Sequence, residues 1–453
     1  MADDGLVTLT ASEAAAEIAR GALSAEDYAR ACLDRIDARE GEIQAFAHLD
    51  REHVLAQAHA LDERRAAGRP IGPLHGVPVA VKDIIDTADY PTEFGSPIGA
   101  GRRPWADATV VSKLRAAGAV IIGKTVTTEF AYFHPGPTRN PHDPARTPGG
   151  SSSGSAAAVA AHMVPLALGT QTNGSVIRPA AFCGVFAVKP SHGLISRAGV
   201  LMLSRKLDHV GAFARSLPDL ALVLDVLAGY DPADADTRPV AAADFRALQR
   251  EKPPLPPRLA FVRTPVWDKA EAQTKAAFEE LIAALGPCVA PVELSPSLAE
   301  AWDTHRTIMA TDMAHNLAPL LARGEPSEVM RKLIAHGRGV SAVDYLAALA
   351  KAPRYAASLV DIFDEYDAIL TPAAPGVAPK GLAATGDPAF CTLWTLTGLP
   401  ALALPLLAGE GGLPLGVQLV GAPGQDARLL RTATALIEML RGTSGGGRRS
   451  RKR

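Results

Sequence analysis

Residues 148–158 read Pro-Gly-Gly-Ser-Ser-Ser-Gly-Ser-Ala-Ala-Ala, and this stretch decides how the rest of the chain is interpreted. Glycine and serine at this density are typical of a flexible linker. The run, however, opens directly into a small-residue helix predicted over 155–162, and an apolar strand candidate follows at 166–168. A linker separates domains, whereas this segment lies inside an alternating core. Glycine and serine in such a place let the backbone approach a ligand closely.

Short apolar segments alternate with helical patterns on both sides of this run. This alternation predicts an α/β fold with helices on both faces of a sheet. The predicted strands are 77–81, 120–122, 166–168, 185–188, 259–262, 289–294, 368–370, 401–405 and 415–420, and the predicted helices include 109–117, 217–227, 269–285 and 426–440.

The chain is predicted to have three parts. Residues 1–70 show helical patterns without chemical motifs and are predicted to form an N-terminal helical layer. Residues 71–441 form the main domain, with a mostly helical insert at about 296–390. The tail at 442–453, GTSGGGRRSRKR, is predicted to be flexible and basic.

Composition excludes several classes of protein. The 453 residues are 47% hydrophobic and 21% charged, as in a soluble globular protein rather than a disordered, collagenous or coiled-coil chain. Five of the 46 basic residues lie in the last six positions, which leaves a mildly acidic body and argues against a nucleic-acid partner. The four cysteines form no CxxC pair, which argues against a zinc site. No signal peptide and no 18-residue apolar run is recognised, so we expect a cytoplasmic protein without membrane contact.

The run at 150–154 also matches the G-x-S-x-G nucleophile elbow of α/β-hydrolases. An elbow requires a strand immediately before its serine. Residues 140–148 hold three prolines and do not fit a central strand. An esterase that uses Ser152 with a histidine and an aspartate therefore stays only as an alternative.

Two further segments carry candidate chemistry. Residues 169–179, GTQTNGSVIRP, lead from a strand through a glycine-containing loop into a short helix. Successive backbone N–H groups at such a turn form an anion-binding concavity, beside which Ser175 is placed to attack a carbonyl. Lys82 directly follows the apolar strand at 77–81, where burial lowers a lysine pKa enough to make a base. The alternatives are a structural serine in a capped turn and a salt bridge from Lys82 to Asp83 or Asp86.

Taken together, Lys82, the run at 149–155 and the Ser175 loop resemble the amidase signature family, in which the two serines are 24 residues apart as here. The similarity extends from about residue 6 to residue 440. It implies one large domain around a central mixed, twisted sheet covered by helices on both faces. It also implies a Ser–cisSer–Lys triad: Ser175 is the nucleophile, Ser151 relays the proton after a cis peptide bond to Gly150, and Lys82 is the base.

The same resemblance implies the rest of the site. The backbone amides of Thr172, Asn173 and Gly174, with that of the nucleophile, would form the oxyanion hole. Ser152 would hydrogen-bond Lys82 and orient it. No cofactor, no metal and no histidine is required.

The sequence departs from the family pattern G-T-D-x-G-G-S-I-R-x-P around the nucleophile. Gln171 replaces the aspartate, and Arg178 stands three residues after the nucleophile instead of two. This variant is similar to malonamidase-type enzymes, in which the shifted arginine meets a substrate carboxylate. Arg178 is therefore predicted either to bind substrate or to pair with a backbone carbonyl or an acid. Phe133 and Gly150 are further predicted substrate contacts, and the helical insert is expected to set specificity.

The expected activity is hydrolysis of C–N bonds in carboxylic amides, extending to aryl amides and to carbamates (a urethanase activity), through an acyl-enzyme. The expected partner is a small-molecule amide or carbamate, with a homodimer through the N-terminal helices as a further possibility. Three alternatives stay open: the glutaminase subunit of a tRNA-dependent amidotransferase, the esterase above, and an inactive binding protein of the same fold.

Overall fold

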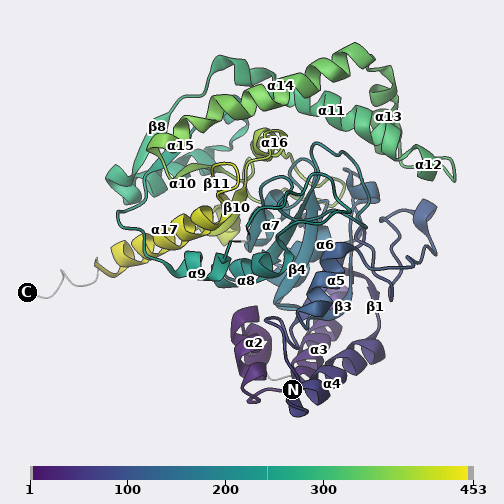
Figure 1. The fold of residues 1–453 in the computed structure, drawn as a ribbon. Coiled ribbons are helices and arrows are strands. Elements are labelled where there is room, and N and C mark those ends of the chain that lie inside the picture. The colour runs from purple at the N-terminus through teal and green to yellow at the C-terminus, as the bar shows by residue number, and fades with distance from the viewer. Residues whose placement is uncertain (1–3, 242, 447–453) are drawn as a thin grey trace, which may run out of the picture.

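A mixed sheet of eleven strands runs through the centre of the computed structural model, which describes residues 4–241 and 243–446 (Figure 1). The strand order is β1-β3-β2-β4-β6-β5-β10-β11-β9-β7-β8. The strands are β1 (Phe46–Leu49), β2 (Pro78–Lys82), β3 (Val120–Thr125), β4 (Leu166–Gln171), β5 (Phe186–Lys189), β6 (His209–Ala214), β7 (Leu259–Val262), β8 (Val289–Val292), β9 (Ala368–Pro372), β10 (Ala401–Ala408) and β11 (Pro414–Val420).

Helices cover both faces of this sheet, as the sequence predicts. Helices α6 and α7 pack on each other and on the central strands, while α8, α9 and α17 form a second packed group (Figure 1). The α-helices are α1 (Asp4–Thr8), α2 (Ala11–Ala19), α3 (Ala25–Ile43), α4 (Arg51–Ala66), α5 (Thr109–Ala116), α6 (Ser153–Ala160), α7 (Ile177–Cys183), α8 (Leu217–Leu227), α9 (Phe245–Arg250), α10 (Ala272–Leu285), α11 (Ala301–Asn316), α12 (Ala318–Leu321), α13 (Glu328–Gly339), α14 (Ala342–Val360), α15 (Ile362–Glu365), α16 (Ala389–Leu396) and α17 (Asp426–Gly446).

Every strand predicted from the sequence is present, but two strands were missed. Strand β6 has the sequence HVGAFA, in which small residues give little β-propensity, and pairs antiparallel with both β4 and β5. Strand β1 lies inside the range 1–70 that the sequence predicts as helical, and it pairs antiparallel with β3. Both strands are therefore selected by tertiary pairing rather than by their own residues.

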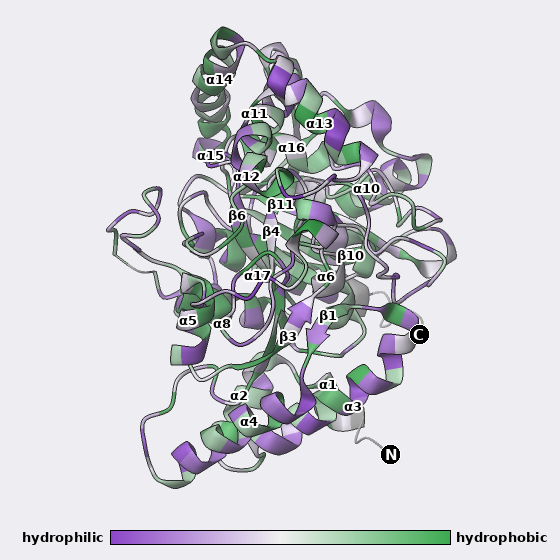
Figure 2. Ribbon diagram, turned by 90° about the vertical axis from the view of Figure 1, so that its right-hand side faces the viewer, coloured by the Kyte–Doolittle hydropathy of each residue, from purple (hydrophilic) through white to green (hydrophobic). Residues whose placement is uncertain are grey.

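Helices α11 to α15 form a layer above the main body, at the top of Figure 1. The predicted insert at 296–390 contains this layer, but β9 interrupts it and returns the chain to the sheet. In Figure 2 hydrophobic colour gathers along the central elements, whereas outer helices such as α3 and α4 alternate between polar and hydrophobic residues. Buried residues of this layer, such as Ile308 and Met330, belong to the same hydrophobic core as the sheet.

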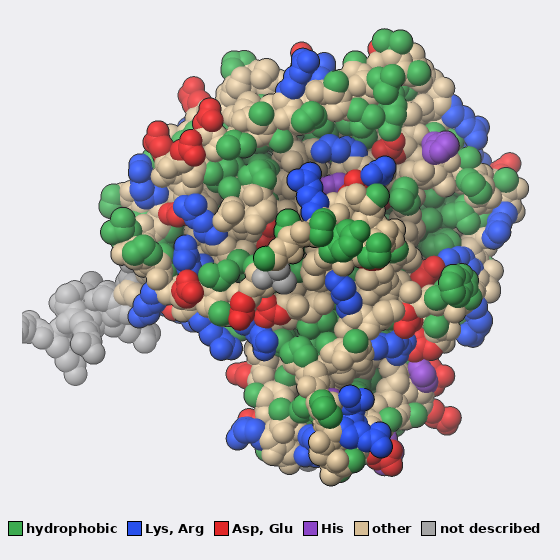
Figure 3. All heavy atoms as spheres, viewed as in Figure 1, with side chains coloured by type: hydrophobic (Ala, Val, Ile, Leu, Met, Phe, Trp, Pro, Cys, Tyr) green, Lys and Arg blue, Asp and Glu red, His purple; other side chains and the backbone are tan. Residues whose placement is uncertain are grey.

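Charged side chains of both signs are interspersed with apolar ones on the face shown in Figure 3. Within the residues described, none of the helices combines the length and hydrophobicity needed to cross a bilayer. In the same part of the chain no group of three or more His, Cys, Asp or Glu side chains is placed to hold a metal ion. The predicted basic tail lies mostly outside the described residues, although α17 extends to Gly446.

Candidate active site

Lys82 is the last residue of β2 and is completely buried. Strands β2 and β4 are parallel neighbours, so their C-terminal ends meet at the same edge of the sheet. There the Lys82 Nζ lies 2.7 Å from Ser151 Oγ and 2.8 Å from Thr170 Oγ1. Burial holds the pKa of Lys82 well below its usual value, and the negative charge of Asp208 opposes this shift. The site therefore favours a neutral amine in contact with a serine hydroxyl.

The two acids that the sequence suggested as ion-pair partners of Lys82 have other partners. Asp83 forms a buried ion pair with Lys124, with 3.1 Å between Oδ1 and Nζ. Asp86 binds Arg102 through both carboxylate oxygens, at 2.6 and 2.7 Å. The salt-bridge alternative for Lys82 is therefore wrong.

Ser151 follows a cis peptide bond from Gly150, as the resemblance implies. The preceding Gly149 has φ +85°, and a Cβ there would lie 2.8 Å from Pro179 Cα, so glycine is required on both counts. Ser152 does not contact Lys82 as expected. Its hydroxyl donates to the carbonyl of Thr170 and accepts from its N–H, both at 3.2 Å. Ser152 therefore fixes the backbone of Thr170, whose side chain makes the contact to the lysine.

The loop at 172–175 presents a row of backbone amides. Among the described residues, no hydrogen-bond acceptor is found for the N–H groups of these four positions. The next two amides, of Val176 and Ile177, donate to Gln171 Oε1 at 2.8 and 3.0 Å. Gln171 thus fixes the end of the loop, and the role of the preceding amides as an oxyanion hole stays a prediction.

A small cavity brings several of the predicted residues together. Ser151, Thr172, Asn173, Ser175 and Arg178 all line it, and the Ser175 side chain is buried. The rest of the wall is largely apolar and consists of Ala131, Tyr132, Phe133, Leu203, Met309 and Met313. Phe133 therefore lies in the wall of the cavity that holds Ser175, and the helical insert contributes two methionines.

Arg178 is buried and donates to two backbone carbonyls. Its Nη2 lies 2.5 Å from the oxygen of Gly150, and its Nη1 contacts that of Gly386. The guanidinium also lies over the ring of Phe133, 5.4 Å from the centroid. Burial lowers the Arg178 pKa to about 10, so the side chain stays charged at neutral pH. These contacts are those of the structural alternative, although Nε has no acceptor among the described atoms.

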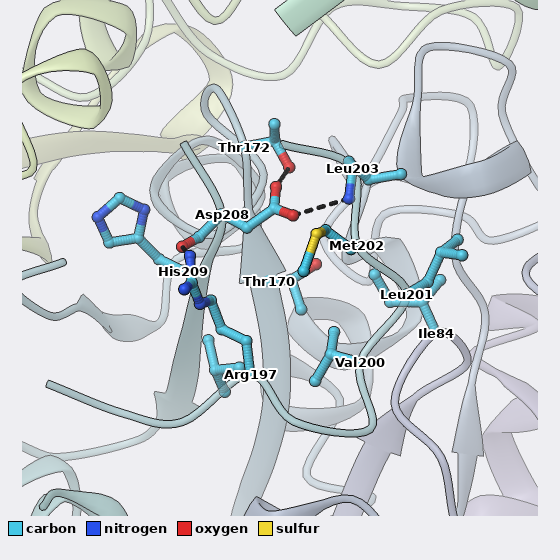
Figure 4. A pocket seen from close by; sticks show the side chains of 11 residues that line it. Ile84, Thr170, Thr172, Arg197, Val200, Leu201, Met202, Leu203, Asp208 and His209 are labelled. Carbon is cyan, nitrogen blue, oxygen red and sulfur yellow. Dashed lines mark hydrogen bonds between the residues drawn. The ribbon is translucent and has the colours of Figure 1, made fainter. Parts of the chain in front are cut away.

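A second small cavity adjoins the first and shares Thr172 and Leu203 with it (Figure 4). In its wall, Asp208 accepts hydrogen bonds from Thr172 Oγ1 at 2.7 Å and from the Leu203 N–H at 2.8 Å (Figure 4). Burial raises the pKa of Asp208 to about 6. Thr170 also lines this cavity, so the second cavity reaches the partner of Lys82.

The sequence analysis missed Thr170, Asp208 and the side chains that hold the amide loop from behind. Those side chains come from distant helices: His305 on α11, and Thr392 and Thr395 on α16. His305 contacts a residue 133 positions away, and no local pattern indicates such a pairing. Thr170, by contrast, lies near the end of a predicted strand beside Lys82, and that placement was a usable signal.

Comparisons with known proteins identify the family and the fold. The sequence model of the Amidase family matches residues 27–430. The chain belongs to the amidase signature family, and its large mixed sheet flanked by helices matches solved structures of that family. Family membership is thus shown by sequence and by fold.

Individual relatives have different activities in their names. The A subunit of glutamyl-tRNA(Gln) amidotransferase from Chloroflexus aurantiacus is 38% identical, covering 95% of this chain and 96% of the relative. Peptide amidase of Stenotrophomonas maltophilia has a TM-score of 0.83 and 30% identity, covering 96% and 97% of the two chains. A chain in the structure of a vestigial protein complex, described as revealing the evolutionary origins of an s-triazine catabolic enzyme, has a TM-score of 0.88 and 32% identity, covering 95% and 98% of the two chains.

Proposed function

We propose that this protein cleaves the C–N bond of a carboxylic amide through an acyl-enzyme on Ser175. The observation that carries the proposal is the buried Lys82, 2.7 Å from a serine hydroxyl that shares a cavity with Ser175. A neutral amine in that position accepts a proton, and a second serine beside unpaired amides supplies a nucleophile and a site for an oxyanion.

In the proposed first step Ser175 Oγ attacks the carbonyl carbon, and its proton passes through Ser151 to Lys82. The amides at 172–175 hold the negative charge that develops on the carbonyl oxygen. The proton then returns through Ser151 to the departing nitrogen, the C–N bond breaks, and a neutral amine or ammonia leaves. Water attacks acyl-Ser175 by the same route and releases the carboxylic acid. Arg178 fixes the carbonyl of Gly150, next to the relay serine.

The lining of the cavity supports an apolar acyl group. Tyr132, Phe133, Met309 and Met313 line it, and within the described residues neither aspartate nor glutamate does. Arg178 already donates to two carbonyls. Aryl amides, and carbamates of similar shape, are therefore the substrate class that we propose, while the observed Arg178 contacts weigh against a carboxylate-bearing acyl group.

The second candidate is the glutaminase subunit of a tRNA-dependent amidotransferase. The full-length similarity to proteins of that name supports it more directly than it supports a free-standing amidase. Glutamine would bring an ammonium and a carboxylate, and a cavity without an acidic side chain offers the ammonium no partner. The lining thus favours the first candidate and the names favour the second, although both use the same C–N chemistry.

A hydrolysis screen of the purified chain separates the candidates. The substrates are an aryl amide, an aryl carbamate, a half-amide of a dicarboxylic acid and L-glutamine, each tested with wild type and Ser175→Ala. Preference for the aryl substrates supports the amidase. Preference for glutamine, with ammonia released, supports the amidotransferase subunit. Equal rates in wild type and Ser175→Ala contradict both.

A further inference from the structure

His305 contacts the backbone of the amide loop through the carbonyl of Thr172. It lies on α11, is buried, and its Nε2 is 2.9 Å from the carbonyl oxygen of Thr172. Burial lowers the pKa of His305 to about 4, so the ring is neutral at pH 7. Because a carbonyl only accepts, Nε2 must carry the ring hydrogen. The contact is therefore a donated hydrogen bond that persists across the neutral pH range.

A hydrogen bond to a backbone carbonyl also fixes the orientation of the N–H group that follows it. In a trans peptide unit the N–H points opposite to the C=O. His305 fixes the carbonyl of Thr172 and therefore sets the N–H of Asn173 in the direction opposite to that carbonyl. Thr395 on α16 does the same one residue later, with its Oγ1 2.5 Å from the carbonyl oxygen of Asn173. Two distant helices thus orient consecutive amides of the loop.

A second path joins α11 to the same loop residue. Asp312 Oδ2 accepts from Ser204 Oγ at 2.5 Å, and the Ser204 N–H donates to Asp208 Oδ2 at 2.9 Å. Asp208 in turn accepts from Thr172 Oγ1 (Figure 4). Thr172 is therefore held at its carbonyl directly by α11 and at its hydroxyl through Ser204 and Asp208.

The helix that holds the loop also lines the cavity. His305, Met309 and Met313 are spaced four residues apart and so share one face of α11. The two methionines line the cavity that holds Ser175. An acyl group that contacts the two methionines therefore contacts the same helix that orients the N–H of Asn173.

We propose that His305 is a positioning residue of the oxyanion hole, and that α11 couples occupation of the acyl pocket to the aim of the Asn173 amide. This inference rests on the proposed amide cleavage. Binding energy from the acyl group then helps to orient the amide that stabilises the oxyanion. Larger acyl groups should therefore raise kcat as well as affinity.

The test compares His305→Met, which has similar bulk but no donor, with His305→Gln, which retains an N–H donor. His315→Met is the matched control, because His315 lies on the same helix but is exposed. Each is assayed on amides that share one leaving group and carry acyl groups of increasing length. We expect His305→Met to lose about 10–100-fold in kcat with less than a threefold change in KM, since losing a whole oxyanion donor costs about 10²–10³-fold. In His305→Met, kcat should no longer rise with acyl length. His305→Gln should restore most of the lost kcat and most of its dependence on acyl length.

A second readout does not depend on amide turnover. A fluorophosphonate probe reacts when a serine oxygen bonds to phosphorus, the P–F bond breaks and fluoride leaves, with the phosphoryl oxygen in the oxyanion hole. Labelling of Ser175 should slow in His305→Met and not in His315→Met. Normal labelling and a retained acyl-length dependence in a folded His305→Met overturn the inference alone. A wild type that neither cleaves amides nor labels at Ser175 overturns the proposed function and the inference together.

Discussion

Lys82 Nζ and Thr170 Oγ1 lie 2.8 Å apart at the ends of neighbouring parallel strands, and both residues are buried. The second partner of the amine is Ser151, also a hydroxyl. Hydroxyl groups orient an amine by hydrogen bonds. Unlike a carboxylate, they carry no negative charge that would offset the cost of burying the charged amine. The pair therefore keeps Lys82 in place while burial favours its neutral form.

Thr170→Val removes this contact with almost no change in shape. We expect kcat to fall about five- to tenfold, which corresponds to one hydrogen bond of about 1 kcal/mol. Thr170→Ser retains the hydroxyl and should stay within about twofold of wild type. Steady-state kinetics on one aryl amide measure both variants, and equal losses in the two would assign Thr170 to packing only.

Lys82→Met replaces the buried amine by an apolar side chain of similar length. We expect activity to fall by at least about 10³-fold, since general-base catalysis contributes about 10²–10⁴-fold and this base serves both half-reactions. The protein should remain folded, because within the described residues Lys82 forms no ion pair that its removal would leave unmatched. Kinetics and a thermal melt test this together. Near-normal turnover in a folded Lys82→Met would rule out the proposed triad.

The pH dependence of the reaction should report Lys82 and its neighbour Asp208. Neutral Lys82 is the base, so kcat/KM should rise with pH through the lowered pKa of this residue. The Asp208 carboxylate raises that pKa, so Asp208→Asn should move the acid limb to lower pH. Because Asp208 itself has a pKa of about 6, wild type and variant should converge below that pH. A limb that moves upward in Asp208→Asn would contradict this electrostatic role.

Much of the site was predictable because its residues follow strands of simple pattern. Lys82 ends an apolar strand, and Ser175 follows a loop that leaves the next parallel strand. Parallel neighbours bring such ends together at one edge of the sheet. The strand pattern therefore predicts the fold class and is consistent with Lys82 and Ser175 lying at one edge of the sheet, whereas the place of Ser151 beside them is implied by the resemblance to the amidase signature family.

The unpredicted part depends on contacts between segments far apart in the chain. His305 and Thr395 act through single hydrogen bonds to backbone atoms 133 and 222 positions away. Every residue has a backbone carbonyl, so the identity of the residue that accepts such a hydrogen bond does not show in the sequence. Strand β6 was missed for a related reason, since its small residues become a strand only by pairing with β4 and β5.

Arg178→Met separates a structural arginine from a substrate clamp. It removes the donors to Gly150 and Gly386, so we expect a loss of about 1–3 kcal/mol in stability from unsatisfied carbonyls. It should also lower kcat for every amide by a similar factor. A substrate clamp through the unpaired Nε would instead raise KM about tenfold or more for a half-amide with a free carboxylate and spare neutral amides. Chemical denaturation and KM values for one charged and one neutral substrate distinguish the two.

Gly174→Ala tests the unpaired amide loop through its shape alone. A Cβ at Gly174 would lie 2.8 Å from Pro388 Cβ and 3.2 Å from both Cβ and Sγ of Cys391, so the loop or α16 must shift. The shift displaces the amides from the carbonyl oxygen, and we expect kcat to fall about 10–100-fold with a smaller change in KM. Gly339→Ala is the control, because a Cβ there meets nothing within 4 Å. Equal kinetics in the two variants, with both folded, would show that the 172–175 amides do not hold the oxyanion.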